Sequence, residues 1–144
     1  MNGYLLDTNV LSELTKPAPA PKVEAFFVTV LSIGEIRKGI ASLPASNRRA
    51  LLENWLDNEI MPWLENRVLP VTLAIAERWG GLSAQLKAKG KIRPIVDAIL
   101  GATAFQHDLV LVTRNVRDYA DLGISILKSL GNSLSAATYC DARA

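Results

Sequence analysis

Acidic residues stand beside short apolar runs at widely separated points of the sequence. Asp7 follows the run YLL directly, and Glu35 lies three residues beyond the end of a second run, FFVTVLS. Asp97 opens a predicted helix, and Asp118 lies in the polar stretch after LVLVT. A carboxylate next to a buried strand costs free energy unless something compensates it. Each acid is therefore either a local structural residue or a ligand for a cation.

Taken singly, each of these acids has a local explanation. Asp is a favoured N-cap residue, so Asp7 could start the next helix. Glu35 could be a solvated residue in a first helical turn, and Asp97 a first-turn acid stabilised by the helix dipole. Asp118 would be an ordinary loop residue. Together they are harder to explain, because two carboxylates about 5 Å apart repel by roughly 3 kcal/mol at an effective dielectric of about 20.

The residue types indicate which cation such a cluster would bind. The chain has one histidine and one cysteine, which argues against a zinc site of the usual nitrogen and sulfur ligands. Oxygen ligands alone suit Mg²⁺ or Mn²⁺, held by one or two carboxylates with several waters retained. Such an ion can activate water and bind a phosphoryl oxygen. The acids therefore indicate hydrolysis of a phosphodiester.

Alternating strands and helices would bring these acids together. Strands are predicted at residues 4–6, 26–32, 67–71, 108–113 and 123–127, and helices at residues 10–16, 33–43, 46–61, 72–89 and 96–107. The prolines at 17–21 predict an extended loop. This alternation implies parallel strands joined by right-handed crossovers, hence an α/β sandwich. Ligands of such folds bind beyond the carboxyl ends of the strands, which is where the acids fall.

Composition limits the class of protein. The 144 residues predict one domain over residues 1–130, followed by a peripheral tail at 131–144. With 49% hydrophobic and 21% charged residues the chain is not disordered, and a net charge of +2 does not by itself indicate a nucleic-acid binder. The single cysteine, the lack of a membrane-spanning run and the lack of a signal peptide predict a cytoplasmic protein without membrane association.

Three stretches together, LLDTNVLSEL, LSIGEIRKGI and IVDAILGATAFQHDLVLVTRN, resemble the PIN-domain ribonucleases. The resemblance is strongest to the VapC-type toxins and their FitB-like branch, and it runs from about Leu5 to Leu127. It implies a PIN-like three-layer sandwich with a mostly parallel central sheet flanked by helices. It also implies an endoribonuclease toxin of a type II toxin–antitoxin system that uses Mg²⁺ or Mn²⁺.

The resemblance also implies partners. These are an RNA substrate, a second copy of the chain in a homodimer, and a cognate antitoxin, a VapB- or FitA-like DNA-binding protein. The helix from Val10 and the helix around Trp55 carry more apolar surface than one small sheet needs. In VapC-like proteins this region receives the C-terminal segment of the antitoxin, so we expect inhibition by such a partner.

Roles for individual residues follow from their positions in the resemblance. The catalytic residues are expected to be Asp7, Glu35, Asp97 and Asp118, with Asp7 and Asp97 binding the metal and Asn9, Thr113 and Asn115 as polar supports. Asn115 stands where many relatives carry the fourth acid. Asp118 is three residues further on, so on a helical turn it would lie on the same face. We therefore expect Asp118 to reach the metal through water.

One departure from the family concerns the stretch between Pro21 and Ser32. Only about KVEAF remains there for a helix and its loop, whereas a crossover needs ~10 residues or more. Relatives have a longer segment at this point. Either the protein lacks the segment or the numbered sequence omits it.

Two other functions are compatible with the residues. A phosphohydrolase with an aspartyl nucleophile would need a second acid where this chain has Asn9, which cannot transfer a proton. An RNA- or partner-binding PIN domain with a weakened metal site fits Asn115, because a missing anionic ligand lowers metal affinity. Basic residues near the acids would let a phosphate backbone approach; they are Arg37, Lys38, Lys89, Lys91, Arg93, Arg114 and Arg117.

Overall fold

A single sheet forms the centre of the protein in the computed structural model, which describes residues 3–14, 26–129 and 139–141. Its strand order is β3-β2-β1-β4-β5-β6. The strands are β1 (Tyr4–Leu6), β2 (Phe26–Thr29), β3 (Val68–Leu69), β4 (Val110–Thr113), β5 (Ile126–Ser129) and β6 (Tyr139–Asp141). The first five strands pair in parallel, and β6 runs antiparallel to β5. The predicted mostly parallel sheet is confirmed.

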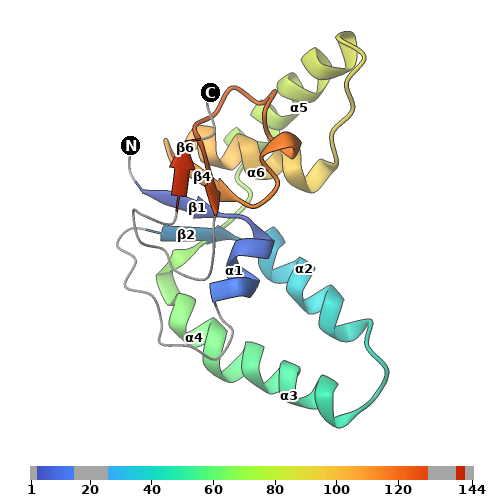
Figure 1. Cartoon of the computed structure of the whole chain (residues 1–144). Helices are drawn as coiled ribbons and strands as arrows, with labels where there is room; N and C mark the ends of the chain where they lie inside the picture. Colours follow the sequence, from blue (N-terminus) through green and yellow to red (C-terminus); the bar gives the residue numbers. More distant parts are fainter. Residues whose placement is uncertain (1–2, 15–25, 130–138, 142–144) are drawn as a thin grey trace.

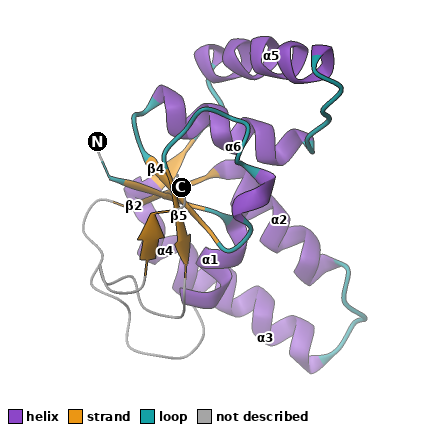
Figure 2. Cartoon of the chain, turned by 45° about the horizontal axis from the view of Figure 1, so that its top comes forward, coloured by secondary structure: helices purple, strands orange, loops and turns teal. Residues whose placement is uncertain are grey.

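Helices cover both faces of this sheet (Figures 1 and 2). On one face lie α1 (Thr8–Leu14), α2 (Val30–Ala41), α3 (Asn47–Trp55), the π-helical turn η1 (Leu56–Ile60) and α4 (Met61–Leu64). On the other lie α5 (Leu73–Ala88) and α6 (Ile95–Gln106). Short 3₁₀ turns are η2 (Glu65–Arg67) and η3 (Val116–Asp118). This is the predicted three-layer sandwich.

Two hydrophobic cores result from the alternation of side chains along the central strands. Leu6 and Val112 are fully buried in the core below α1 to α4. Leu5 and Leu111, their neighbours in β1 and β4, are equally buried in the core below α5 and α6. Because both faces are covered, these strands are continuous apolar runs, as parallel strands usually are.

Helix starts agree with the predicted caps at two places. The Ser46 side chain accepts a hydrogen bond from the Arg49 amide at the start of α3, and Thr72 accepts one from the Ile75 amide at the start of α5. The helix predicted at 46–61 is longer in the structure, because α3 continues through η1 into α4, which ends at Leu64. Pro62 does not interrupt this helix: it lies at the start of α4, directly after η1, whose wider i→i+5 turn closes with the Met61 amide donating to the Leu56 carbonyl.

The strand predicted at 26–32 is too long. It ends at Thr29, whose hydroxyl accepts a hydrogen bond from the Ser32 amide and caps α2. Val30 has high strand propensity, but this cap and the buried positions Ile36 and Ile40 favour a helix. Glu35 is therefore in the second turn of α2, not just after a strand.

The ends of the chain also differ from expectation. The strand predicted at 123–127 lies at Ile126–Ser129, and β6 from the predicted tail extends the sheet at its edge. The division at residue 130 stays a prediction. The predicted loop at 17–21 and most of the short stretch between Pro21 and Ser32 lie outside the described residues. The strands on either side, β1 and β2, are parallel, and α1 is part of the crossover that connects them.

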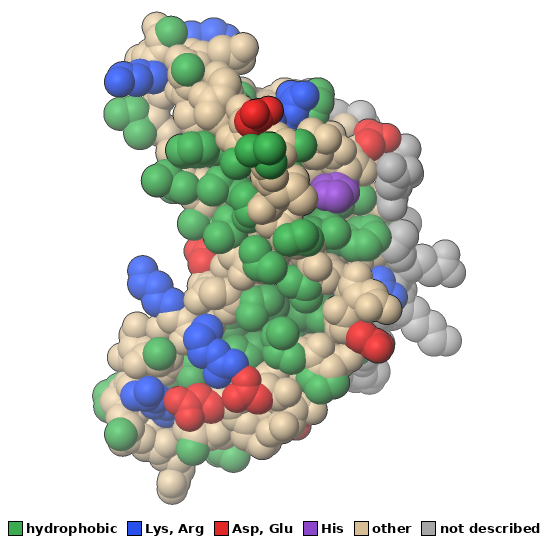
Figure 3. Space-filling model, turned by 180° about the vertical axis from the view of Figure 1, so that it is seen from behind, with side chains coloured by type: hydrophobic (Ala, Val, Ile, Leu, Met, Phe, Trp, Pro, Cys, Tyr) green, Lys and Arg blue, Asp and Glu red, His purple; other side chains and the backbone are tan. Residues whose placement is uncertain are grey.

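The surface opposite to the view of Figure 1 carries hydrophobic side chains across its middle, between α5 above and α3 and α4 below (Figure 3). Within the described residues, no helix is both long enough and apolar enough to cross a membrane.

Candidate acidic active site

The carboxyl ends of β1 and β4 meet at Asp7. The two strands pair with Leu6 opposite Val112, and the Asp7 amide donates to the Val112 carbonyl at 2.9 Å. Thr113, the last residue of β4, therefore comes beside Asp7 from a distant part of the chain. The edge of the sheet where ligands of α/β folds bind is thus occupied by a carboxylate.

The Asp7 carboxylate is buried and held at both oxygens. Its side chain is 8% exposed, Oδ1 accepts from the Thr8 amide at 2.7 Å and Oδ2 accepts from the Thr113 hydroxyl at 2.8 Å. The backbone N–H of Asn115 donates in turn to Thr113 Oγ1 at 3.0 Å, and this bond orients the Thr113 hydroxyl. The main-chain carbonyl of Asp7 accepts from the Val10 and Leu11 amides. Asp7 therefore starts α1 with its backbone, and its side chain is oriented by β4.

Glu35 reaches this site from α2 through Thr8. The Thr8 hydroxyl donates to Glu35 Oε1 at 2.7 Å and lies 3.1 Å from Ser32 Oγ. Because Thr8 also donates its amide to Asp7, one residue links both carboxylates. Neither Thr8 nor Ser32 was among the predicted site residues.

Asp97 lies in the first turn of α6 and is half-buried. Burial raises the pKa of its carboxyl above the ordinary value, while a hydrogen bond from the Tyr119 hydroxyl at 3.3 Å works in the opposite direction. The negative charges of Asp7, Asp118 and Glu35 raise this pKa further. The four predicted acids therefore share one electrostatic environment.

Tyr119 is a site residue that the sequence did not reveal. Its side chain is 1% exposed, and burial together with the charges of Asp7 and Asp97 raises the pKa of its hydroxyl far above the ordinary value. The hydroxyl thus stays protonated and can donate to a carboxylate. The only signal in the sequence was a tyrosine directly after Asp118, which reads equally well as a core residue.

The other predicted residues occupy different positions. Asp118 is half-buried in η3, and its amide donates to the Asn115 carbonyl at 3.1 Å. Asn115 contributes its backbone to the site through Thr113. Asn9 Oδ1 is buried without a hydrogen-bond partner among the described residues, so the support expected from Asn9 stays a prediction.

The set of donors fits a hard divalent cation. Within residues 3–14, 26–129 and 139–141, no three Asp, Glu, His or Cys side chains are grouped so that they could hold a metal together. The predicted roles of Asp7, Glu35, Asp97 and Asp118 therefore stay predictions. Two carboxylates completed by water are nevertheless the usual protein ligands of Mg²⁺. Asp7 and Asp97 are such a pair, because the charge of Asp7 raises the pKa of Asp97.

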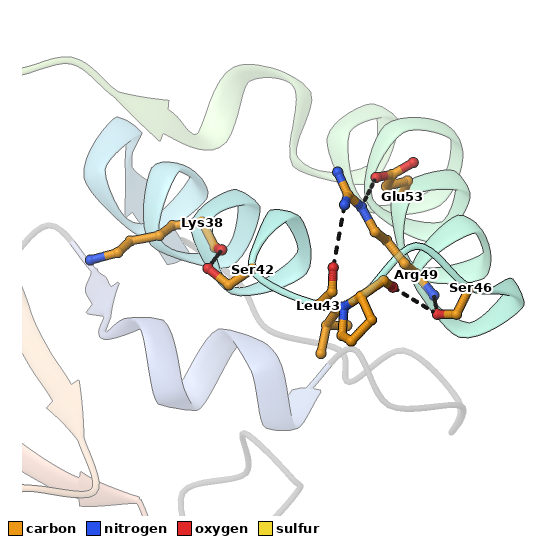
Figure 4. A network of polar contacts seen from close by, with 7 residues as sticks. Lys38, Ser42, Leu43, Ser46, Arg49 and Glu53 are labelled. Carbon is orange, nitrogen blue, oxygen red and sulfur yellow. Dashed lines mark hydrogen bonds and ion pairs between the residues drawn. The ribbon is translucent and has the colours of Figure 1, made fainter.

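An apolar groove of ≈ 660 Å³ begins at Thr8 and Glu35 and runs between α1, α2 and α3. Its apolar walls are Ile36, Ile40, Leu43, Leu51, Leu52 and Trp55. The turn between α2 and α3 is fixed by Arg49, whose guanidinium donates to the Leu43 carbonyl at 3.3 Å and to Glu53 at 2.8 Å (Figure 4). Because this turn is braced, α2 and α3 hold the groove open beside the acids.

Comparison with known proteins agrees with this fold. The family profile described as PIN domain matches residues 4–123. The VapC ribonuclease Y4jK of Sinorhizobium fredii is 34% identical over 132 residues, which cover 85% of this chain and 94% of that protein. The toxin FitB of Neisseria gonorrhoeae is 28% identical over 131 residues, with 85% and 94% covered. The solved structure of FitAB bound to an IR36 DNA fragment has a TM-score of 0.75 and 26% identity, and the match covers 87% of this chain and 94% of that chain. The chain therefore belongs to the PIN-domain family, in the group that contains the VapC ribonucleases and the toxin FitB.

Proposed function

We propose that this protein is a divalent-metal-dependent endoribonuclease of the cytoplasm, acting as the toxin of a type II toxin–antitoxin pair. The observation that carries the proposal is the buried Asp7 carboxylate, oriented by Thr8 and Thr113 at the end of the central strands. The charges of Asp7, Glu35 and Asp118 all act on Asp97. The relative named a VapC ribonuclease supports RNA as the substrate.

Asp7 and Asp97 would hold the Mg²⁺ or Mn²⁺ ion. When bound, such an ion supplies an acidic water and stabilises negative charge on a phosphoryl oxygen. Thr113 and Thr8 keep the Asp7 carboxylate in one orientation, so that little reorganisation is needed when substrate arrives. Tyr119 keeps its proton and holds one oxygen of Asp97. Glu35 is exposed, accepts a hydrogen bond from the Thr8 hydroxyl and would accept a proton from the attacking water.

Cleavage of total cellular RNA tests the function directly. Discrete cuts are expected with Mg²⁺ or Mn²⁺ and none with EDTA, and mapping the new ends identifies the sequence that is cut. Cleavage that persists in EDTA would exclude the metal-dependent reaction.

Millimolar Mn²⁺ is expected to raise the melting temperature of the metal-free protein. A ligand that binds the folded state alone stabilises it by RT ln(1 + [L]/Kd), which is ~2.7 kcal/mol at 100 times Kd. Differential scanning fluorimetry measures this shift. Ca²⁺, which prefers more ligands at longer distances, is the control and should give a smaller shift.

An RNA- or partner-binding PIN domain with a weakened metal site is the second candidate. It is favoured by Asn115 in place of an acid and by the lack of a group of three ligands among the described residues. It predicts RNA binding without cleavage and an unchanged melting temperature in Mn²⁺. The phosphohydrolase with an aspartyl nucleophile is not supported, because the chain belongs to the PIN-domain family.

Thr113→Val should reduce cleavage about tenfold, corresponding to ~1.4 kcal/mol in the barrier. Valine has nearly the same shape but cannot donate to the buried Asp7 carboxylate, and a hydrogen bond to a charged group contributes about 1.5–3 kcal/mol. Single-turnover cleavage and urea unfolding measure the two effects. Thr113→Ser keeps the hydroxyl and is the matched control; equal losses in both variants would show that packing, not the hydrogen bond, matters.

The antitoxin is proposed to bind in the apolar groove beside Glu35. FitAB, a structure similar to this chain, was solved with DNA, which supports a DNA-binding partner encoded alongside the toxin. Leu51 lines the groove and is 69% exposed, an unfavourable position for a large apolar side chain without a partner. The hydrophobic surface in Figure 3 is a second apolar area and supports the proposed homodimer.

Leu51→Glu should weaken the complex with the neighbouring gene product by at least about tenfold and relieve inhibition, because the complex would bury a charged carboxylate in place of an apolar side chain. Nuclease activity of the free protein should be unchanged. Leu73→Glu, at a 77% exposed position on α5, is the matched control. If both variants bind the partner like the wild type, the partner uses another surface.

A further inference from the structure

We propose that the cavity beside Asp118 is a subsite for a backbone phosphate of the RNA, next to the bond that is cut, with Arg117 and Lys128 as the groups that bind it. The inference rests on the proposed nuclease function and extends it by a defined contact. The cavity has a volume of ≈ 450 Å³ and is lined by Arg114, Asn115, Val116, Arg117, Asp118 and Lys128.

Charge makes this cavity suitable for an anion. Three of its lining side chains are cationic and one is anionic, so the lining has an excess of two positive charges. Arg117 and Lys128 are both exposed and can therefore approach a ligand from solvent. Guanidinium and ammonium groups are the usual ligands of phosphate oxygens.

The location of the cavity next to the active site indicates that its ligand is a phosphate of the RNA substrate and not a separate molecule. The Asn115 amide, in the wall of the cavity, donates to Thr113 Oγ1, and Thr113 donates to Asp7. Lys128 pairs with Thr113 in the parallel register of β4 and β5, so their backbones are one strand spacing apart, about 4.8 Å. On the other side, the charge of Asp118 acts on Asp97. Neither Asp7 nor Asp97 lines the cavity, but two successive hydrogen bonds connect its wall to Asp7, and its Asp118 acts on Asp97 through charge.

A phosphate subsite beside the acids would also offset the repulsion between their carboxylates and the RNA backbone. Four carboxylates at one edge of the sheet repel a polyanionic RNA, and one divalent ion neutralises only part of that charge. Cations from the turn after β4 and from β5 can hold the neighbouring phosphate while the acids remain free for the reaction. The subsite thus positions the strand, and does not take part in bond cleavage.

RNA binding can be measured without cleavage in an Asp7→Asn background, using a labelled single-stranded oligoribonucleotide that the wild type cuts. Binding to single strands weakens with salt with a slope of about −0.7 per phosphate contact. The double variant Arg117→Gln/Lys128→Gln should reduce that slope by ~0.7, the contribution of the one phosphate, and each single variant should reduce it by less. In the active enzyme the double variant should raise KM about tenfold or more and leave kcat nearly unchanged, because these contacts are equal in ground and transition states.

Arg78→Gln is the control for loss of a charge. Arg78 stacks on Phe105 at the far end of α6, eight residues or about 12 Å along the helix from Asp97, and should leave the salt slope unchanged. An oligoribonucleotide with one uncharged methylphosphonate linkage beside the cleaved bond provides a double-mutant cycle. The methylphosphonate oligoribonucleotide should bind the parent protein more weakly than the unmodified one does, and Lys128→Gln should not weaken its binding further.

The results separate this proposal from the proposed function. Metal-dependent cleavage with an unchanged salt slope in the double variant would overturn the subsite and leave the nuclease intact. Loss of antitoxin binding instead of RNA binding would assign the cavity to the partner and also overturn it. A protein that neither cuts nor binds RNA would overturn both.

Discussion

Asp7→Asn is expected to reduce RNA cleavage by about 10²–10³-fold, the loss seen when one preorganised electrostatic group is removed from an active site. The substitution keeps the shape of the side chain and an oxygen that can accept from Thr113, but it removes the charge that would bind the metal. The fold should therefore survive while the reaction does not. Gel-based cleavage in Mn²⁺ and circular dichroism measure the two properties.

Two further Asp→Asn variants make this result specific. Asp57→Asn, on the surface of η1, loses only an exposed ion pair with Arg37 and should cut RNA normally. Asp118→Asn should slow cleavage less than Asp7→Asn, because Asp118 is expected to act through water. Equal damage at the two positions would make Asp118 a direct metal ligand.

Asp97→Asn is expected to abolish cleavage to a similar extent and, at the same time, to stabilise the metal-free protein at pH 7. Burial raises the pKa of Asp97 in the folded state above its ordinary value of 3.8. The folded state therefore binds a proton more tightly than the unfolded chain does. Stability from this group is fully present below pH 3.8 and is lost as the pH rises through the folded-state pKa. At pH 7 the charged Asp97 weakens the fold.

Thermal melts at two pH values test this prediction. Without metal, the variant should melt a few degrees above the wild type at pH 7, and the difference should disappear near the ordinary pKa of the carboxyl. In Mn²⁺ the order should reverse, because only the wild type gains stability from the ion. Equal melting temperatures at pH 7 without metal would show that the raised pKa has no effect on the fold. Melting temperatures measured with and without Mn²⁺ would together show that the charged Asp97 destabilises the metal-free fold and stabilises the metal-bound one.

The elements of this protein were largely predictable because their signals are local. The apolar runs at β1 and β4 have the length of buried strands, and Ser46 and Thr72 cap helices through residues three positions away. The predicted end of the strand at 26–32 is wrong, because the Thr29 hydroxyl caps a helix although its neighbours Val28 and Val30 are β-branched. The strand β6 was missed, because an edge strand of three residues has no distinctive pattern of its own.

The sequence alone determined the two layers of helices and the parallel sheet, and it predicted the kind of chemistry. Asp7 and Asp118 follow strands whose carboxyl ends share one edge, and the low number of histidines and cysteines favoured a hard cation over zinc. Tertiary structure alone decided how these acids are held. The Thr113–Asp7 bond joins residues 106 positions apart, and Tyr119 reaches Asp97 across 22. Burial, a raised pKa and a hydrogen bond of this span exist only once distant segments pack together, so no local pattern can contain them.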